Sequence, residues 1–249
     1  MRVTVKELAR INAVAAVLLV VLALTGCAGN GLANDPIEPV NRAMFRFNEK
    51  ADQWVVKPVA ETYREVAPAP VKKGVANFFS NIGDASSALN YGLQARPLPS
   101  FYSFSRFLLN STAGVLGVMD VTGENGHRRY PQTGFGDTLA VWGWRNSSYL
   151  VLPLLGPSTL RDGIGTAATL SFQYGLLGSP DAASNAGVNI VSGISQRERL
   201  LGLEETIDQA ALDPYAYTRD VWLQARARKT GGVVPGQPQD QEDIDDLMK

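Results

Sequence analysis

Cys27 is the residue whose surroundings point most directly to chemistry. It follows Leu24, Thr25 and Gly26, so one branched aliphatic residue and two small residues precede it. Small residues give a peptidase access to the backbone, and the thiol of Cys27 can accept a diacylglycerol. The chain holds one cysteine, so an intramolecular disulfide is excluded and the thiol needs another role. We therefore predict that Cys27 is lipidated.

The residues before Cys27 have the two parts of a signal peptide. Residues 1–10 are basic, and residues 11–24 form an apolar run that is shorter than the roughly 20 residues of a spanning helix. Together with the cysteine motif they resemble the start of a bacterial lipoprotein, anchored by acyl chains on the new N-terminus. A plain secretory signal or a short membrane anchor is the alternative. Ala28 stands where an aspartate would resemble an inner-membrane retention signal, which favours the outer membrane.

Other residues that could do chemistry form weaker patterns. His127 is the one histidine, so a His-rich metal site is excluded. Asp137 and Asp162 could form an acid/base pair, but a helix cap or a salt bridge to a neighbour such as Arg161 is the commoner role. Residues 163–168 match a loose dinucleotide loop without a convincing strand before it. Since no nucleophile, base and orienting residue stand together, we expect no enzyme, metal site or cofactor.

Helices dominate the expected structure before residue 120. Apolar residues spaced three to four apart from Asp35 to Val56 predict an amphipathic helix that Lys57-Pro58 breaks or kinks. Further helices are expected over residues 59–66, over 71–82 and 85–94 on either side of Gly83, and over 100–118. The stretch 121–134 is rich in Gly and polar residues and predicts a loop.

A stretch with very few charges lies between Asn146 and Gln196. Its charged residues are Arg161, Asp162 and Asp181. Two interpretations stay open: a buried core hairpin, or contact with lipid in a cavity or in the bilayer. Prolines and glycines interrupt the apolar runs, so backbone groups at membrane depth would need partners in protein or water. A helix assembly within one leaflet, with a wet interior, would supply them and could pass a phospholipid.

The remaining chain completes the expected domain organisation. Residues 207–228 predict one or two helices broken at Asp213-Pro214, and the acidic tail is expected to be disordered. The net charge of −1 and the lack of a basic surface argue against nucleic acid as a partner. We expect four parts: a signal peptide (1–26), a lipidated tether (27–34), one helical domain (35–229) and the tail (230–249).

Several motifs occur in a fixed order across the domain. They are residues 35–48 (DPIEPVNRAMFRFN), 57–60 (KPVA), 77–81 (NFFSN), 90–94 (NYGLQ), 106–110 (RFLLN), 135–139 (FGDTL), 152–162 (LPLLGPSTLRD) and 213–219 (DPYAYTR). This series resembles the MlaA/VacJ family of outer-membrane lipoproteins.

The resemblance implies an all-α fold, in which a single ring-like assembly of amphipathic helices surrounds a central channel and lies in one membrane leaflet. It implies a lipid-anchored protein on the periplasmic side of the outer membrane. Such a protein removes mislocalised phospholipids from the outer leaflet and passes them to a periplasmic carrier (MlaC-like), and it binds a trimeric porin. No bond is made or broken. A porin-binding scaffold and an envelope phospholipase are the alternatives, and the missing nucleophile set disfavours the phospholipase.

Family members also place a helical hairpin with a glycine-rich turn beside the channel. The matching stretch is Phe135 to Arg161, in which Gly143 remains but residues 144–148 (WRNSS) replace the usual glycines and proline. Non-glycine residues tolerate positive φ poorly, so less flexibility is expected here. The residues expected to face lipid are Leu139, Trp142, Tyr149, Leu152 and Leu155.

Overall fold

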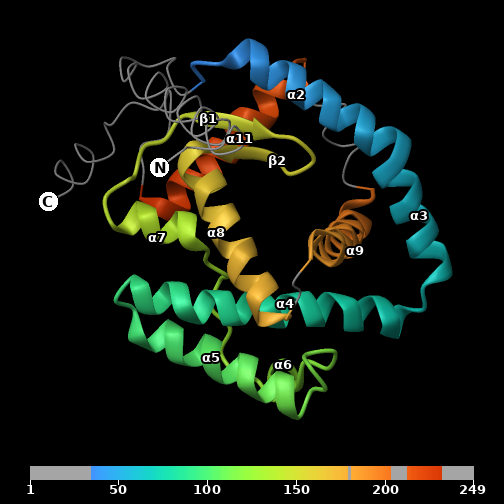
Figure 1. The fold of residues 1–249 in the computed structure, drawn as a ribbon, viewed down its shortest axis with the longest axis vertical. Coiled ribbons are helices and arrows are strands. Elements are labelled where there is room, and N and C mark those ends of the chain that lie inside the picture. Colours follow the sequence, from blue (N-terminus) through green and yellow to red (C-terminus); the bar gives the residue numbers. More distant parts are fainter. Residues whose placement is uncertain (1–34, 179–180, 203–211, 232–249) are drawn as a thin grey trace, which may run out of the picture.

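The computed structural model describes residues 35–178, 181–202 and 212–231. Cys27, the signal peptide, the tether and the tail beyond residue 231 lie outside these residues. In chain order the elements are α2 (Glu38–Ala51), η1 (Asp52–Val56), α3 (Lys57–Val66), α4 (Ala69–Leu93), α5 (Pro97–Thr112), α6 (Val121–Glu124), α7 (Phe135–Val141), β1 (Tyr149–Leu152), β2 (Gly156–Thr159), α8 (Leu160–Leu176), α9 (Ala182–Leu200) and α11 (Pro214–Thr230). Figure 1 shows α2 and α3 along the outline of the molecule and α4 with α5 on its outer side, whereas α8 and α9 lie farther in.

The first three elements follow one another, so the chain does not break at Lys57-Pro58, where a break or kink was predicted. Proline has no backbone N–H, and its ring clashes with the carbonyl four residues earlier. The chain accommodates Pro58 with a π-helical turn, η1, in which the N–H of Lys57 donates to the carbonyl of Asp52, five residues back. Helical structure therefore continues from α2 into α3 (Figure 1).

Helix α4 is one continuous helix, although two shorter helices were predicted around Gly83. A methyl group at Gly83 would lie 2.4 Å from the side chain of Gln132. The Gln132 amide donates to the carbonyl of Ser80 at 2.8 Å and to the carboxylate of Asp84 at 3.3 Å. Gly83 therefore lets the loop before α7 lie directly on α4 and does not end the helix.

Helix α5 ends at Thr112, so the helix predicted over residues 100–118 is wrong beyond that point. After it, Val115, Leu116 and Gly117 have φ angles of 52°, 57° and 89°. A non-glycine residue in this left-handed region costs on the order of 1–3 kcal/mol and persists only where its surroundings enforce it. We call residues 114–119 the apolar tip. The short helix α6 then lies within the predicted loop.

A β-hairpin stands where the resemblance implied a helical one, so the fold is mostly helical and not all-α. Tyr149 of β1 pairs with Thr159 of β2 in antiparallel register. Leu154 and Gly156 between them have φ angles of 61° and 79°. An α-helix cannot accommodate these angles, and Pro157 lacks the N–H that a helix would require. The prolines and glycine that interrupt this apolar run thus produce a turn between strands.

Helices α7 and α8 cross at a contact between two glycines. A methyl group at Gly165 would lie 2.2 Å from the backbone nitrogen of Gly136. The backbones can approach this closely because neither residue has a side chain. The glycine pattern at 163–168 thus serves helix packing, with Thr159 capping α8 by accepting from the N–H of Asp162.

The hydrophobic core lies where the two ends of the described chain meet. It consists of Tyr149, Val151, Tyr215 and Leu223, with Met44, Phe45 and Trp222 packed against it. Asn41 of α2 donates to the carbonyl of Tyr149 at 3.2 Å and accepts from the N–H of Val151 at 2.9 Å. Helix α11 begins at Pro214, where a break in the helix was predicted, and the carboxylate of Asp213 caps it by accepting from the N–H of Ala216. The core thus joins α2, the hairpin and α11.

Candidate functional site

An apolar groove of about 730 Å³ lies between α4 and α9. Its lining contains no charged side chain, and its one polar side chain is Ser184. The lining residues are Pro70, Val71, Gly74, Val75, Phe78, Phe79, Val118, Ser184, Gly187, Val188 and Val191. A groove of this volume and apolar character falls within the range of ligand pockets.

Two glycines and the apolar tip shape this groove. A methyl group at Gly74 would lie 2.9 Å from Cγ1 of Val118, so the tip reaches directly onto α4. A side chain at Gly187 on the opposite wall would meet no atom within 4 Å. The missing side chain of Gly187 therefore leaves open space in the groove.

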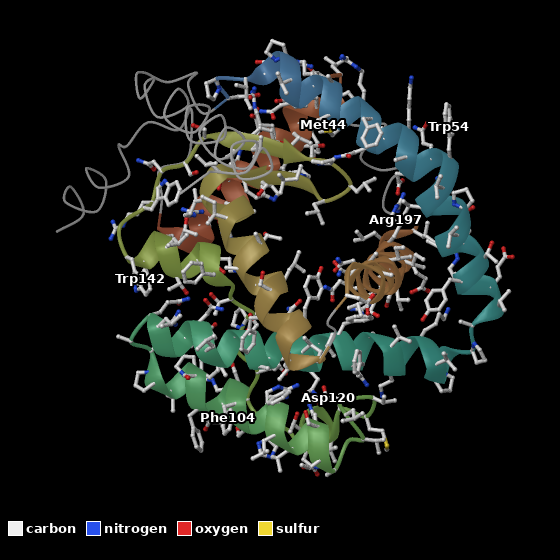
Figure 2. All side chains as sticks on the ribbon, viewed as in Figure 1. Met44, Trp54, Phe104, Asp120, Trp142 and Arg197 are labelled. Atoms are coloured by element: carbon white, nitrogen blue, oxygen red, sulfur yellow. The ribbon has the colours of Figure 1, made fainter. Side chains whose placement is uncertain are left out.

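Ion pairs fix the charged end of α9, whereas its first part is uncharged. Residues 182–196 carry no charged side chain. Beyond them, Arg197 donates to both carboxylate oxygens of Asp52 at 2.8 and 2.7 Å, and Glu198 pairs with Lys72 at 3.2 Å. Figure 2 shows Arg197 between α9 and the helices at the edge. These pairs attach α9 to its neighbours and leave the groove free of charge.

The wider distribution of side chains is inverted relative to that of a water-soluble protein. Among the described residues, more polar and charged residues than hydrophobic ones are buried, and many large hydrophobic side chains are exposed. Figure 2 shows Trp54, Phe104 and Trp142 at different edges of the molecule, pointing away from its centre. Exposed apolar surface on this scale marks contact with a membrane or a partner.

None of the helices in the described ranges combines the length and the apolarity needed to cross a membrane.

The five residues predicted to face lipid have different environments, and none of them lines the groove. Trp142 and Leu155 are 57% and 62% exposed, and Leu139 and Leu152 are half-buried. Tyr149 is 0% exposed, and its ring contacts those of Tyr215 and Trp222 at 6.2 and 6.0 Å. The prediction for Tyr149 is therefore corrected: pairing of β1 with β2 turns this side chain into the core.

The turn before the hairpin is held by Arg161. Its buried guanidinium donates to the carbonyls of Trp144 and Arg145 at 3.0 and 2.8 Å. The backbone N–H of Arg161 donates to the hydroxyl of Ser147 at 2.9 Å. These bonds restrain the segment that lacks the family's usual glycines. Within residues 143–148, Gly143 is the residue with a positive φ angle, 114°, a conformation that favours glycine.

Asp137 and Asp162 are held in a network of ion pairs, as the commoner of the two interpretations predicted. Arg226 of α11 contacts Asp137 at 2.7 Å and Asp162 at 2.5 Å, Lys229 contacts Asp137 at 2.9 Å, and Arg161 contacts Asp162 at 3.1 Å. Burial of Asp137 favours its neutral form, but Arg226 and Lys229 outweigh this and lower its pKa to about 2. The pKa of Asp162 is lowered in the same way, with Arg161 and Arg226 opposing its burial. Both carboxylates therefore stay ionised, and their ion pairs hold α7, α8 and α11 together. An ionised carboxylate has no proton to donate, so neither residue is suited to act as a general acid.

The remaining candidate groups do not assemble into a reactive site. His127 is exposed in the loop before α7. No group of three or more metal-ligating side chains occurs within the described part of the chain. Within the described residues, the feature that stands out is therefore the apolar groove.

Sequence reasoning missed the groove because its walls are more than a hundred residues apart. The signal on one wall was present: Val71, Val75, Phe78 and Phe79 have helical spacing on one face of α4. Pairing that face with Gly187 and Val191 required the tertiary structure. The other wall does lie within the low-charge stretch that was singled out for lipid contact.

Comparisons with known proteins identify related lipoproteins. A family model described as MlaA lipoprotein matches residues 33–229. The intermembrane phospholipid transport system lipoprotein MlaA of Escherichia coli (strain K12) is 34% identical over 208 residues, which is 81% of this chain and 82% of that protein. The lipoprotein of the same name from Haemophilus influenzae is 32% identical over 218 residues, or 83% of this chain and 86% of that protein.

A solved structure, from work on the structural basis for maintenance of bacterial outer membrane lipid asymmetry, is also similar. It superimposes with a TM-score of 0.70 at 33% sequence identity, and the match covers 79% of this chain and 98% of the solved one.

Proposed function

Because the chain belongs to the MlaA lipoprotein family, we propose that it removes mislocalised phospholipids from the outer leaflet of the outer membrane and passes them to a periplasmic carrier. The relatives from Escherichia coli and Haemophilus influenzae are named as lipoproteins of a phospholipid transport system and not as enzymes. The observation that carries the proposal is the groove between α4 and α9, whose lining is apolar and uncharged.

The groove suits the acyl part of a phospholipid. Each methylene left in water instead of against an apolar wall would cost about 0.8 kcal/mol, so the groove lets acyl chains leave the bilayer without that penalty. Polar side chains lie close by on α8 and α9, where the amide of Asn189 donates to the hydroxyl of Tyr174. A phospholipid headgroup could follow such groups while its chains stay against the apolar wall.

In this proposal the helical domain, residues 35–229, lies in the inner leaflet as a ring around a channel. The acyl chains on Cys27 anchor it from the periplasmic side, and the exposed side chains at its edge contact lipid. A trimeric porin holds the protein in place, and an MlaC-like carrier receives the phospholipid. Trp142 and Leu155 are the predicted lipid-facing residues whose exposure best supports this placement.

A deletion strain tests the proposal. Loss of the protein should cause phospholipid to accumulate in the outer leaflet and should sensitise cells to detergent with chelator, and the unaltered gene should reverse both. Unchanged outer-leaflet phospholipid in the deletion strain would refute transport. Release of free fatty acid from phospholipid by the purified protein would instead support the phospholipase alternative.

An exposed position separates transport from scaffolding. Leu155→Asp places a charge on a side chain that is 62% exposed, so folding should be retained. We expect the variant to bind its porin but to lose transport, whereas Leu155→Met should keep both. Full transport by Leu155→Asp would contradict the assignment of Leu155 to lipid contact.

A further inference from the structure

The apolar tip presents hydrophobic side chains outward from the end of α5. Residues 107–119 contain no charged side chain. Val115, Leu116, Val118 and Met119 are all exposed, Leu116 by 68%. In a water-soluble protein an uncharged loop with such exposed apolar side chains would normally fold back onto the protein, so the outward conformation of the tip needs a structural explanation.

Backbone hydrogen bonds hold the tip rigid. The N–H of Gly117 donates to the carbonyl of Asn110 at 2.8 Å, and the N–H of Met119 donates to the carbonyl of Gly114 at 2.9 Å. The amide of Asn77 on α4 donates to the carbonyl of Val118 at 3.1 Å. These bonds keep Val115 and Leu116 in the left-handed conformation that neither residue prefers.

A buried polar network fixes the base of the tip. The amide of Asn110 donates to Asp120 and to Thr122, each at 3.0 Å, and Arg106 reaches both Asp84 at 3.3 Å and Asp120 at 3.2 Å. Figure 2 shows Asp120 beside α4 and α5 at the tip's end of the molecule. Polar groups therefore lie inside and apolar groups outside, as is expected where the surrounding medium is apolar.

From this geometry we propose that the apolar tip is a rigid wedge that enters the acyl layer of the membrane at the edge of the groove. The inference rests on the proposed function, since it takes the body to lie in lipid. Val118 connects the wedge to the groove, because its side chain lines the groove and reaches the backbone at Gly74. Lipid is the partner that fits because the backbone N–H groups of residues 116–119 and the carbonyl of Val118 are bonded within the protein, and the exposed side chains of the tip are apolar.

Fluorescence quenching in proteoliposomes tests the wedge in the full lipidated protein. Because Cys27 is expected to be acylated, Leu116→Cys introduces one free thiol for an NBD label, with the unsubstituted chain as background. Lipids carrying a doxyl group in the acyl chain should quench this label at least threefold more than a label at His127→Cys, in an exposed polar loop. Equal quenching at the two positions would overturn the inference.

A second variant separates a wedge from a structural turn. Asparagine tolerates the left-handed conformation, so Leu116→Asn should keep or raise the melting temperature in detergent. A label at Met119→Cys in that background should nevertheless be quenched at least twofold less. Unchanged quenching would show that the tip is a turn only. A third label in the groove, at Val191→Cys, separates the two proposals. If lipid quenches this label but not the label at the tip, the wedge is refuted and the proposed function stands. If lipid quenches neither label, the proposed function is refuted as well.

Discussion

Filling the groove tests its role without disturbing the packing around it. Gly187 lines the groove, and a side chain there would meet no atom within 4 Å. Leucine in place of a glycine inside helix α9 also stabilises the helix by about 0.8–1 kcal/mol. We therefore expect Gly187→Leu to raise the melting temperature slightly while it blocks access to the apolar wall.

The expected loss of binding follows from the size of the new side chain. Leucine adds four carbons and so displaces roughly four methylene groups of a bound acyl chain, which is about 3 kcal/mol. This corresponds to binding weaker on the order of 100-fold. Binding of a short-chain phospholipid with a pyrene-labelled acyl chain, added as a monomer from water below its critical micelle concentration, measures this loss, and outer-leaflet phospholipid in cells reports its consequence.

Gly193 provides a matched control on the same helix. A side chain there also meets no atom within 4 Å, but the residue does not line the groove. Gly193→Leu should give the same small gain in melting temperature without loss of lipid binding. The reasoning is refuted if Gly187→Leu binds lipid normally, or if both variants lose binding equally.

Three further substitutions test other parts of the account. Arg226→Met should lower the free energy of unfolding on the order of 2–4 kcal/mol at neutral pH, because it removes a cation from two part-buried carboxylates. The folded-state pKa of Asp137 is depressed to about 2, so this stabilisation exists above about pH 4 and is lost as the pH falls toward 2. Urea unfolding should therefore show that the difference in unfolding free energy between the variant and the unaltered protein shrinks over that range. A difference that stays constant would contradict the role of Asp137. Gly165→Ala should destabilise the protein by about 1–3 kcal/mol or more in thermal melts. Gly175→Ala, which lies in open space on the same helix, should not. Equal melting temperatures for the two variants would contradict the close crossing of α7 and α8. Cys27→Ser should leave the chain unacylated by mass spectrometry and unanchored in cell fractionation, and a membrane-bound serine variant would argue against lipid anchoring.

Local signals predicted those parts of the fold that depend on neighbouring residues. The break predicted at Asp213-Pro214 coincides with the start of α11, and the family followed from motifs spread over the whole domain. Asp137 and Asp162 were expected to serve as a helix cap or in a salt bridge, and both form salt bridges. The sequence could not show that Arg226, far along the chain, joins them.

Features that depend on distant contacts could not be predicted. The burial of Tyr149 requires pairing with β2 and a hydrogen bond from Asn41, 108 positions earlier. An apolar run broken by proline and glycine is compatible with a strand, a helix end or a loop, so the hairpin was misassigned. The π-turn before Pro58 has no sequence signal of its own, because proline itself is compatible with a kink or a break.

Site-specific photocrosslinking in living cells tests most directly whether the low-charge stretch contacts acyl chains. A photoreactive residue at Val191, half-exposed on the groove wall, should yield adducts with phospholipid, and the same residue at His127 should not. Phospholipid adducts confined to the groove position are the predicted result. Absence of lipid adducts at Val191, in a protein that is folded and membrane-bound, would contradict the account.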